Sequence, residues 1–290
     1  MDLLLQMTFN GVLIGGILAL LTIGFQLTFG VLHVIDFAVG GWVMLGGYAG
    51  YYMGTLVGLG PFLAIPPVFV AFALIGYSLG PLIYRVRSSR YARPDLMALA
   101  FTFGIFILMR GGALTVWGFN TRNVESAFSA DSVEIFGATL PALRVAAFGL
   151  ALVLTLALFV MLHRTRFGLA VQAVAQNRQN AALMGIDVKK VSAAVYGIYT
   201  GLTSAAGVLI AAIYSVNPEV GVKYTLFAFF VAVLAGMGSV NGVLVAALFL
   251  GVIEAFVAGY VGAIYSHFVV FGALYIVLLV SPSGILRQGS

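Results

Sequence analysis

The chain has 290 residues, of which 62% are hydrophobic and only 8% are charged, and its mean hydropathy is +1.12. A soluble domain is about half apolar and about a quarter charged, so this composition excludes a water-soluble globule. The net charge of +5 indicates orientation in a membrane protein, so we expect no nucleic-acid partner. The absence of cysteine excludes disulfides and thiolate metal sites.

Apolar stretches separated by turn residues and charges predict an all-α polytopic membrane protein with about eight transmembrane helices, each of about 20 residues. Two stretches are candidates for broken or re-entrant segments, so the prediction extends from eight to ten helices. We expect residues 1–290 to form a single transmembrane domain. The stretches lie at 8–32, 36–58, 62–83, 96–117, 141–162, 192–214, 225–240, 243–259 and 262–281.

Basic residues are concentrated in two connections, which the positive-inside rule places in the cytoplasm. The first connection carries Arg85, Arg87, Arg90 and Arg93, and the second carries Arg164, Arg166, Arg178, Lys189 and Lys190. The connection between them carries Glu125, Asp131 and Glu134. Counting spans from these connections predicts an amino terminus outside and a cytoplasmic carboxyl terminus. The predicted number of membrane spans changes if residues 225–259 form one transmembrane span and one re-entrant segment.

Four glycines recur every four residues in the second stretch, at Gly46, Gly50, Gly54 and Gly58. Small residues at this spacing let helix backbones approach closely in lipid. The stripe therefore predicts tight packing within the bundle, with a dimer interface as the alternative.

Enzymatic chemistry has little support in the sequence. Residues 76–80 match the G-x-S-x-G nucleophile elbow around Ser78, but they lie inside a predicted helical span and not in a strand-turn-helix. His33, His163 and His267 lack metal-site spacing, and no Gly-Lys pair provides a phosphate-binding loop. We therefore expect no enzyme, no metal and no cofactor, and any nucleotide that drives this protein binds to another chain.

Three ionisable residues fall within or beside the apolar stretches, where charge is costly and indicates function. Asp36 either caps a helix that starts at Phe37 or lies on a solute pathway. Arg110 either extends its side chain toward the membrane surface or pairs with Glu254. Glu254, in an almost wholly apolar stretch, requires a partner, a proton or a wet cavity.

The connection at 163–191 is predicted to form short helices with small, apolar faces, and the last of these helices ends at a glycine. Such helices dock either on the membrane face of the chain itself or on a cytoplasmic partner. The residues expected at the contact are Ala181, Ala182, Met184 and Gly185.

Several motifs resemble the membrane-spanning permease subunits of branched-chain amino-acid ABC importers, the LivH type. They are residues 9–11, 29–31 and 37–46, the Arg166–Ile186 loop, Asn217-Pro218, residues 233–242, Glu254 and residues 281–286. The resemblance implies a multi-pass protein of the bacterial inner membrane that works with two ATPase subunits, a second permease subunit, either identical or homologous, and an extracytoplasmic solute-binding protein. It also implies that 163–191 is the ATPase coupling loop.

The chain departs from the family pattern at five positions. The family commonly reads Asn-Phe-Ala-His-Gly-Glu where this chain has Asp36-Phe37-Ala38-Val39-Gly40-Gly41, and it often carries tyrosine and lysine where this chain has Leu18 and Phe227. We expect the pathway along 36–41 and a facing stretch, 227–242, that includes Gly236 and Gly238, because glycine-interrupted helices mark such sites. Its lining is then less polar than in the family.

The function predicted on this basis is transport of a small solute of the branched-chain, hydrophobic amino-acid or related class. The alternative is a self-sufficient channel or secondary transporter for a small neutral solute, which does not require a helical cytoplasmic docking loop.

Overall fold

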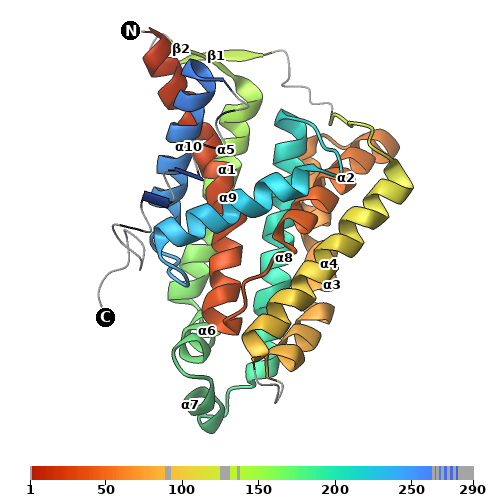
Figure 1. Ribbon diagram of the computed structural model, residues 1–290, viewed down its shortest axis with the longest axis vertical. Helices are drawn as coiled ribbons and strands as arrows, with labels where there is room; N and C mark the ends of the chain where they lie inside the picture. The colour runs from red at the N-terminus through yellow and green to blue at the C-terminus, as the bar shows by residue number, and fades with distance from the viewer. Residues whose placement is uncertain are drawn as a thin grey trace.

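The computed structural model describes residues 2–88, 93–124, 131–135, 138–262, 265, 268, 271–272, 275–276 and 279. These residues form a helical bundle with one two-stranded hairpin (Figure 1). The elements are α1 (Asp2–Leu32), α2 (Val39–Val57), α3 (Pro61–Arg87), α4 (Pro94–Trp117), β1 (Ser132–Ile135), β2 (Ala138–Pro141), α5 (Ala142–Arg164), α6 (Arg166–Gln176), α7 (Arg178–Leu183), α8 (Val188–Ile213), α9 (Val220–Ala235) and α10 (Val243–Tyr260). Much of the predicted span at 262–281 lies outside the described residues, as do Arg90, Glu125, His267 and residues 281–286.

Six helices within the described part of the chain are long and apolar enough to cross a membrane: α1, α3, α4, α5, α8 and α10. The prediction of an all-α polytopic membrane protein is confirmed. The predicted span at 225–240 is wrong in its bounds, because α9 begins at Val220 and ends at Ala235. Its 16 residues extend about 24 Å, less than the roughly 30 Å of a hydrocarbon core, and α9 runs obliquely across the bundle (Figure 1).

The two basic connections lie at the same end of the bundle, the bottom of Figure 1, where α6 and α7 are found. Arg87 Nε donates to the His33 carbonyl at 3.3 Å, so the end of α3 lies beside the end of α1. The β1–β2 hairpin lies at the opposite end with the start of α1, where Gln6 Nε2 donates to the Thr139 carbonyl at 3.3 Å. We call these the loop end and the hairpin end.

Helices α1 and α8 form the centre of the bundle. In the most apolar window of each, 83% of residues are buried, against 22–28% in α3, α4, α5 and α10. Glycines bring the neighbouring backbones close: a Cβ at Gly15 of α1 would lie 2.7 Å from Leu248 Cα of α10, and one at Gly80 of α3 would lie 2.6 Å from Ala193 Cα of α8. Close backbone approach therefore holds the peripheral helices to the central pair.

Only half of the glycine stripe on α2 has a packing role. A Cβ at Gly46 would lie 2.5 Å from Ser204 Cα, and one at Gly50 would lie 2.8 Å from Val208 Cγ1, both on α8. A Cβ at Gly54 would meet only the Leu59 carbonyl at 3.6 Å, and Gly58 ends the helix with a φ of 72°. The expectation that the whole stripe packs within the bundle is corrected, because a Cβ at Gly54 or Gly58 would meet no atom of another helix within 4 Å.

Ser78 lies inside α3, and its hydroxyl donates to the Ile75 carbonyl at 2.6 Å. The serine therefore bonds its own helix, as the sequence predicts, and the nucleophile-elbow geometry is not formed.

Candidate functional site

The chain between α1 and α2 is irregular and buried around Asp36, whose residue is 1% exposed. One carboxylate oxygen accepts from the Ala38 amide at 2.7 Å, which closes a turn two residues long. Helix α2 begins only at Val39, so the predicted cap of a helix starting at Phe37 is corrected to a turn that precedes the helix. The carboxylate also lies beside the hydroxyls of Tyr196 and Tyr199 on α8.

Polar atoms gather around this break in the helical chain. Tyr196, Tyr199 and Trp42 are each at most 1% exposed. The two tyrosine hydroxyls lie beside the Asp36 carboxylate, and the Tyr196 hydroxyl also lies beside the indole N–H of Trp42. Irregular backbone at membrane depth is tolerated only where protein or a cavity covers it, and here α8 covers it. The break is therefore a buried polar cluster within an apolar bundle.

The start of α2 is held between α9 and α4. The Gly40 amide donates to Thr225 Oγ1 of α9 at 3.2 Å, and a Cβ at Gly40 would overlap the Gly221 carbonyl. A Cβ at Gly41 would lie 2.6 Å from Met109 Sδ of α4. Residues 221 and 225 of α9 therefore contact the start of α2.

The predicted residues Gly236 and Gly238 instead lie beside α1. Gln26 Nε2 donates to the carbonyls of Ala232 and Gly236 at 2.8 and 3.0 Å, and Gln26 Oε1 accepts from the Gly238 amide at 2.6 Å. One buried side chain therefore satisfies the end of α9, whose last carbonyls lack helical partners. Sequence reasoning missed Gln26, although a glutamine inside an apolar span is a visible signal.

The other predicted pathway residues pack inside the subunit. Leu18, Val39 and Phe227 are buried, and the ring of Phe37, which is partly exposed, meets the edge of Phe103 with centroids 6.0 Å apart. These positions belong to three different helices and the α1–α2 break, and Leu18, Val39 and Phe227 lie in one buried hydrophobic cluster.

The predicted pairing of Arg110 with Glu254 is wrong. Glu254 on α10 pairs with Lys223 of α9 at 3.6 Å, and Arg110 pairs with Glu219, which immediately precedes α9. The ammonium of Lys223 also lies 5.5 Å from the centroid of the Phe227 ring. Lys223 thus lies one helical turn before Phe227, the position at which the resemblance to the family implies a lysine.

The 163–191 connection forms the two short helices α6 and α7, each started by a side-chain cap. Thr165 Oγ1 accepts from the Gly168 amide and Asn177 Oδ1 from the Asn180 amide, both at 3.0 Å. Asp187 starts α8 by accepting from the Lys190 amide at 3.1 Å, and this hydrogen bond lowers the pKa of the Asp187 carboxyl.

The tip of this connection exposes apolar side chains. Leu183 and Met184 are 86% and 84% exposed, and Ala182 and Gly185 beside them are also exposed. Ala181 is only 4% exposed, so of the four predicted contact residues it packs inward while the other three face outward. The tip of α7 therefore presents a small, exposed apolar surface.

Arg178 joins the connection to the core of the bundle. Its Nε and Nη2 atoms donate to the Val31 carbonyl of α1 at 3.1 and 2.6 Å. Arg87, from the other basic connection, donates to the His33 carbonyl nearby. The last carbonyls of α1 lack helical partners, and cations are favoured at that end of a helix. Both basic connections thus bind the helix end that precedes Asp36 by only a few residues.

Among the described residues, six helices are long and apolar enough to cross a bilayer, and they pack around a buried break in the helical chain. This arrangement indicates a multi-pass membrane protein.

The comparisons with known proteins identify the family. The profile described as the permease component of the branched-chain amino acid transport system matches residues 7–279, so the chain belongs to that family. It is 32% identical to the high-affinity branched-chain amino acid transport system permease protein LivH of Escherichia coli, over 98% of this chain and 96% of that protein.

Other relatives are more distant. The chain is 29% identical to the corresponding permease BraD of Pseudomonas aeruginosa, over 98% of this chain and 96% of that protein. It is 28% identical to the ribose import permease protein RbsC of Escherichia coli, over 86% of this chain and 74% of that protein. No solved structure matches the chain.

Proposed function

We propose that the chain is the transmembrane permease subunit of an ATP-binding-cassette importer for branched-chain or other hydrophobic amino acids in the bacterial inner membrane. The apolar tip of α7 is the observation that carries this proposal. Leu183 and Met184 are exposed there, at the end where both basic connections lie, and the chain itself has no phosphate-binding loop. A self-sufficient channel has no use for such a tip.

The proposed orientation puts the loop end in the cytoplasm, following the positive-inside rule, and the hairpin end with the amino terminus outside. Two ATPase subunits then bind at the loop end, one to each of two permease subunits, of which the second is a copy or a homologue of this chain. A solute-binding protein delivers its ligand at the hairpin end.

The proposed pathway runs beside the α1–α2 break and α9. Support comes from the broken backbone around Asp36, the contact of Gly40 with Thr225, and the Lys223–Glu254 pair. Val39, Gly41, Leu18 and Phe227 replace more polar family residues, so recognition relies on shape and apolar contact, with Asp36 as the acidic group.

The coupling role is tested with Ala182→Glu and Met184→Glu, each matched by a conservative control, Ala182→Ser and Met184→Leu. A charge cannot enter an apolar cleft without a large desolvation cost, so we expect both glutamates to abolish co-purification of the ATPase and uptake in vesicles. The controls retain both. Unchanged association and uptake in the two glutamate variants would remove the coupling assignment.

A further inference from the structure

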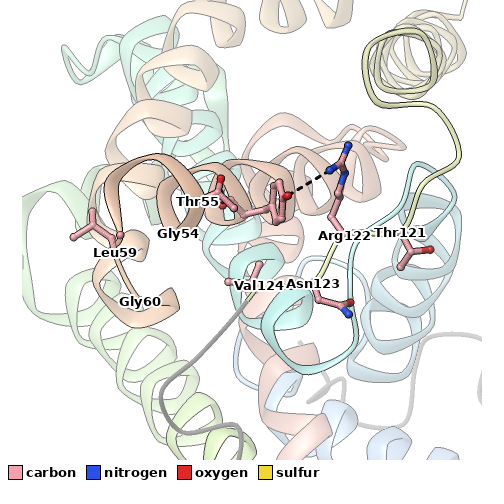
Figure 2. Close-up of a pocket in the computed structure, with 10 residues that line it drawn as sticks. Gly54, Thr55, Leu59, Gly60, Thr121, Arg122, Asn123 and Val124 are labelled. Atoms are coloured by element: carbon pink, nitrogen blue, oxygen red, sulfur yellow. Dashed lines mark hydrogen bonds between the residues drawn. The ribbon is translucent and has the colours of Figure 1, made fainter.

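A pocket opens at the hairpin end, between the last turn of α2, the turn into α3 and the segment that follows α4 (Figure 2). Its volume is about 800 Å³, which is within the range of small-molecule sites. Arg122 and Tyr51 lie together on one side of it, and their hydrogen bond is the dashed line in Figure 2. The lining residues are Tyr51, Gly54, Thr55, Gly58, Leu59, Gly60, Thr121, Arg122, Asn123 and Val124.

The backbone of Arg122 is fixed. Its amide donates to the Val216 carbonyl and its carbonyl accepts from the Val216 amide, both at 2.8 Å, in an isolated antiparallel bridge to the segment after α8. The segment that carries the arginine is therefore tied to the centre of the bundle independently of the side chain.

The guanidinium of Arg122 is also oriented. Nη1 donates to the Tyr51 hydroxyl at 3.3 Å, and the Cζ atom lies 5.4 Å from the centroid of the Tyr51 ring. Its Nε atom is buried and has no hydrogen-bond partner, and no carboxylate of the described residues pairs with it. An oriented guanidinium that pairs with no carboxylate in the described part of the chain is suited to a ligand carboxylate, whose two oxygens match its donor fork.

The rest of the lining suits a small amphiphilic solute. The hydroxyls of Thr55 and Thr121 and the amide of Asn123 can accept from an ammonium group, while Leu59 and Val124 offer apolar contact. A Cβ at Gly58 or Gly60 would meet nothing within 4 Å, so these glycines leave open space for a ligand side chain. The mechanism proposed above does not use any of these residues.

We propose that this hairpin-end pocket binds the carboxylate of a small amino acid through Arg122, before the solute reaches the transmembrane pathway. The direction of transport rests on the proposed function, whereas the ligand chemistry rests on the pocket alone. An acidic side chain of a partner protein is the rival occupant. The pocket favours a solute, because Arg122 lies against the wall formed by Tyr51 with its Nε buried, and not on an exposed rim.

The probes are L-leucine, L-leucinamide, in which the carboxylate is replaced by an uncharged amide, and 4-methylpentanoate, which retains the carboxylate but has no amine. Binding to the purified full-length permease in lipid nanodiscs, without a solute-binding protein, is measured by thermal stabilisation. We expect leucine and 4-methylpentanoate to stabilise the protein and leucinamide to have no effect.

The matched variants are Arg122→Gln, which removes the charge, and Arg122→Lys, which keeps it. We expect Arg122→Gln to weaken leucine binding at least tenfold and Arg122→Lys to weaken it less. Gly60→Leu fills the pocket at a position with an ordinary φ of −60° and blocks binding by a separate route. Retained co-purification with the ATPase shows that each variant is folded.

Equal stabilisation by leucinamide, or unchanged leucine binding in Arg122→Gln, overturns the proposal. So does a permease that binds none of the probes but loses affinity for the solute-binding protein on Arg122→Gln, which would assign the pocket to an acidic side chain of that partner. Failure of the Ala182→Glu test, by contrast, removes the coupling assignment and leaves the measured binding of the probes intact.

Discussion

Alanine substitution along the α2 stripe separates the glycines that pack from those that do not. At Gly46 a Cβ would lie 2.5 Å from Ser204 Cα, where 3.4–4 Å is an ordinary contact. The α2 and α8 backbones would have to separate by roughly 1 Å, and overpacking of this kind costs about 1–3 kcal/mol. At Gly54 the new methyl group meets only the Leu59 carbonyl at 3.6 Å, and replacing a helical glycine by alanine gains about 0.5–1 kcal/mol.

We therefore expect Gly46→Ala to lower the melting temperature of the detergent-solubilised protein and Gly54→Ala to leave it unchanged or raise it. At about 2–4 °C per kcal/mol for a chain of this size, the two variants differ by several degrees. Separation of the helices also breaks the hydrogen bond from Ser204 Oγ to the Trp42 carbonyl. If the two variants melt together, or if Gly54→Ala melts lower, the α2–α8 packing described above is wrong.

Two further predictions concern the partly buried cations Arg178 and Lys223. Arg178→Ala removes both hydrogen bonds to the Val31 carbonyl, so we expect an importer that still binds its ATPase but takes up less solute per ATP hydrolysed. Arg178→Gln keeps one donor group and should retain more of this coupling. Normal uptake per ATP in Arg178→Ala would refute a role of the Arg178–Val31 contact in coupling. Lys223→Met leaves Glu254 without its cation and should destabilise the protein by about 1–3 kcal/mol in thermal melts. We expect the double variant Lys223→Met/Glu254→Gln to recover most of this lost stability. Equal melting temperatures of the single and double variants would contradict the Lys223–Glu254 pairing.

Much of the architecture could be predicted from the sequence because a bilayer imposes a length. A helix that crosses it needs about 20 apolar residues, and α1, α3, α4, α5, α8 and α10 each correspond to a predicted stretch. The exposure of Ala182, Met184 and Gly185 agrees with the outward face expected of the 163–191 connection, and the docking role of that face stays a prediction. The motifs of the family pattern extend along most of the chain, so the family was recognisable as well.

Neighbouring helices determine the rest. Glu254 pairs with Lys223 and not with Arg110 because α9 crosses the bundle obliquely and brings its first turn to α10. The backbone bridge between Arg122 and Val216, which lie about 90 residues apart in the chain, holds Arg122 where its side chain reaches Tyr51. No local pattern encodes either contact.

Hydropathy is also uninformative about faces in a membrane protein. In water a polar face and an apolar face distinguish the outside of a helix from its inside, but lipid is as apolar as a neighbouring helix. The glycines of α2 have the same spacing throughout, and only the packing of α8 makes Gly46 a contact and leaves Gly54 part of a pocket wall. The sequence alone therefore determined which segments enter the membrane, and the tertiary structure decided which of their faces meet, because burial against lipid and burial against protein select the same residues.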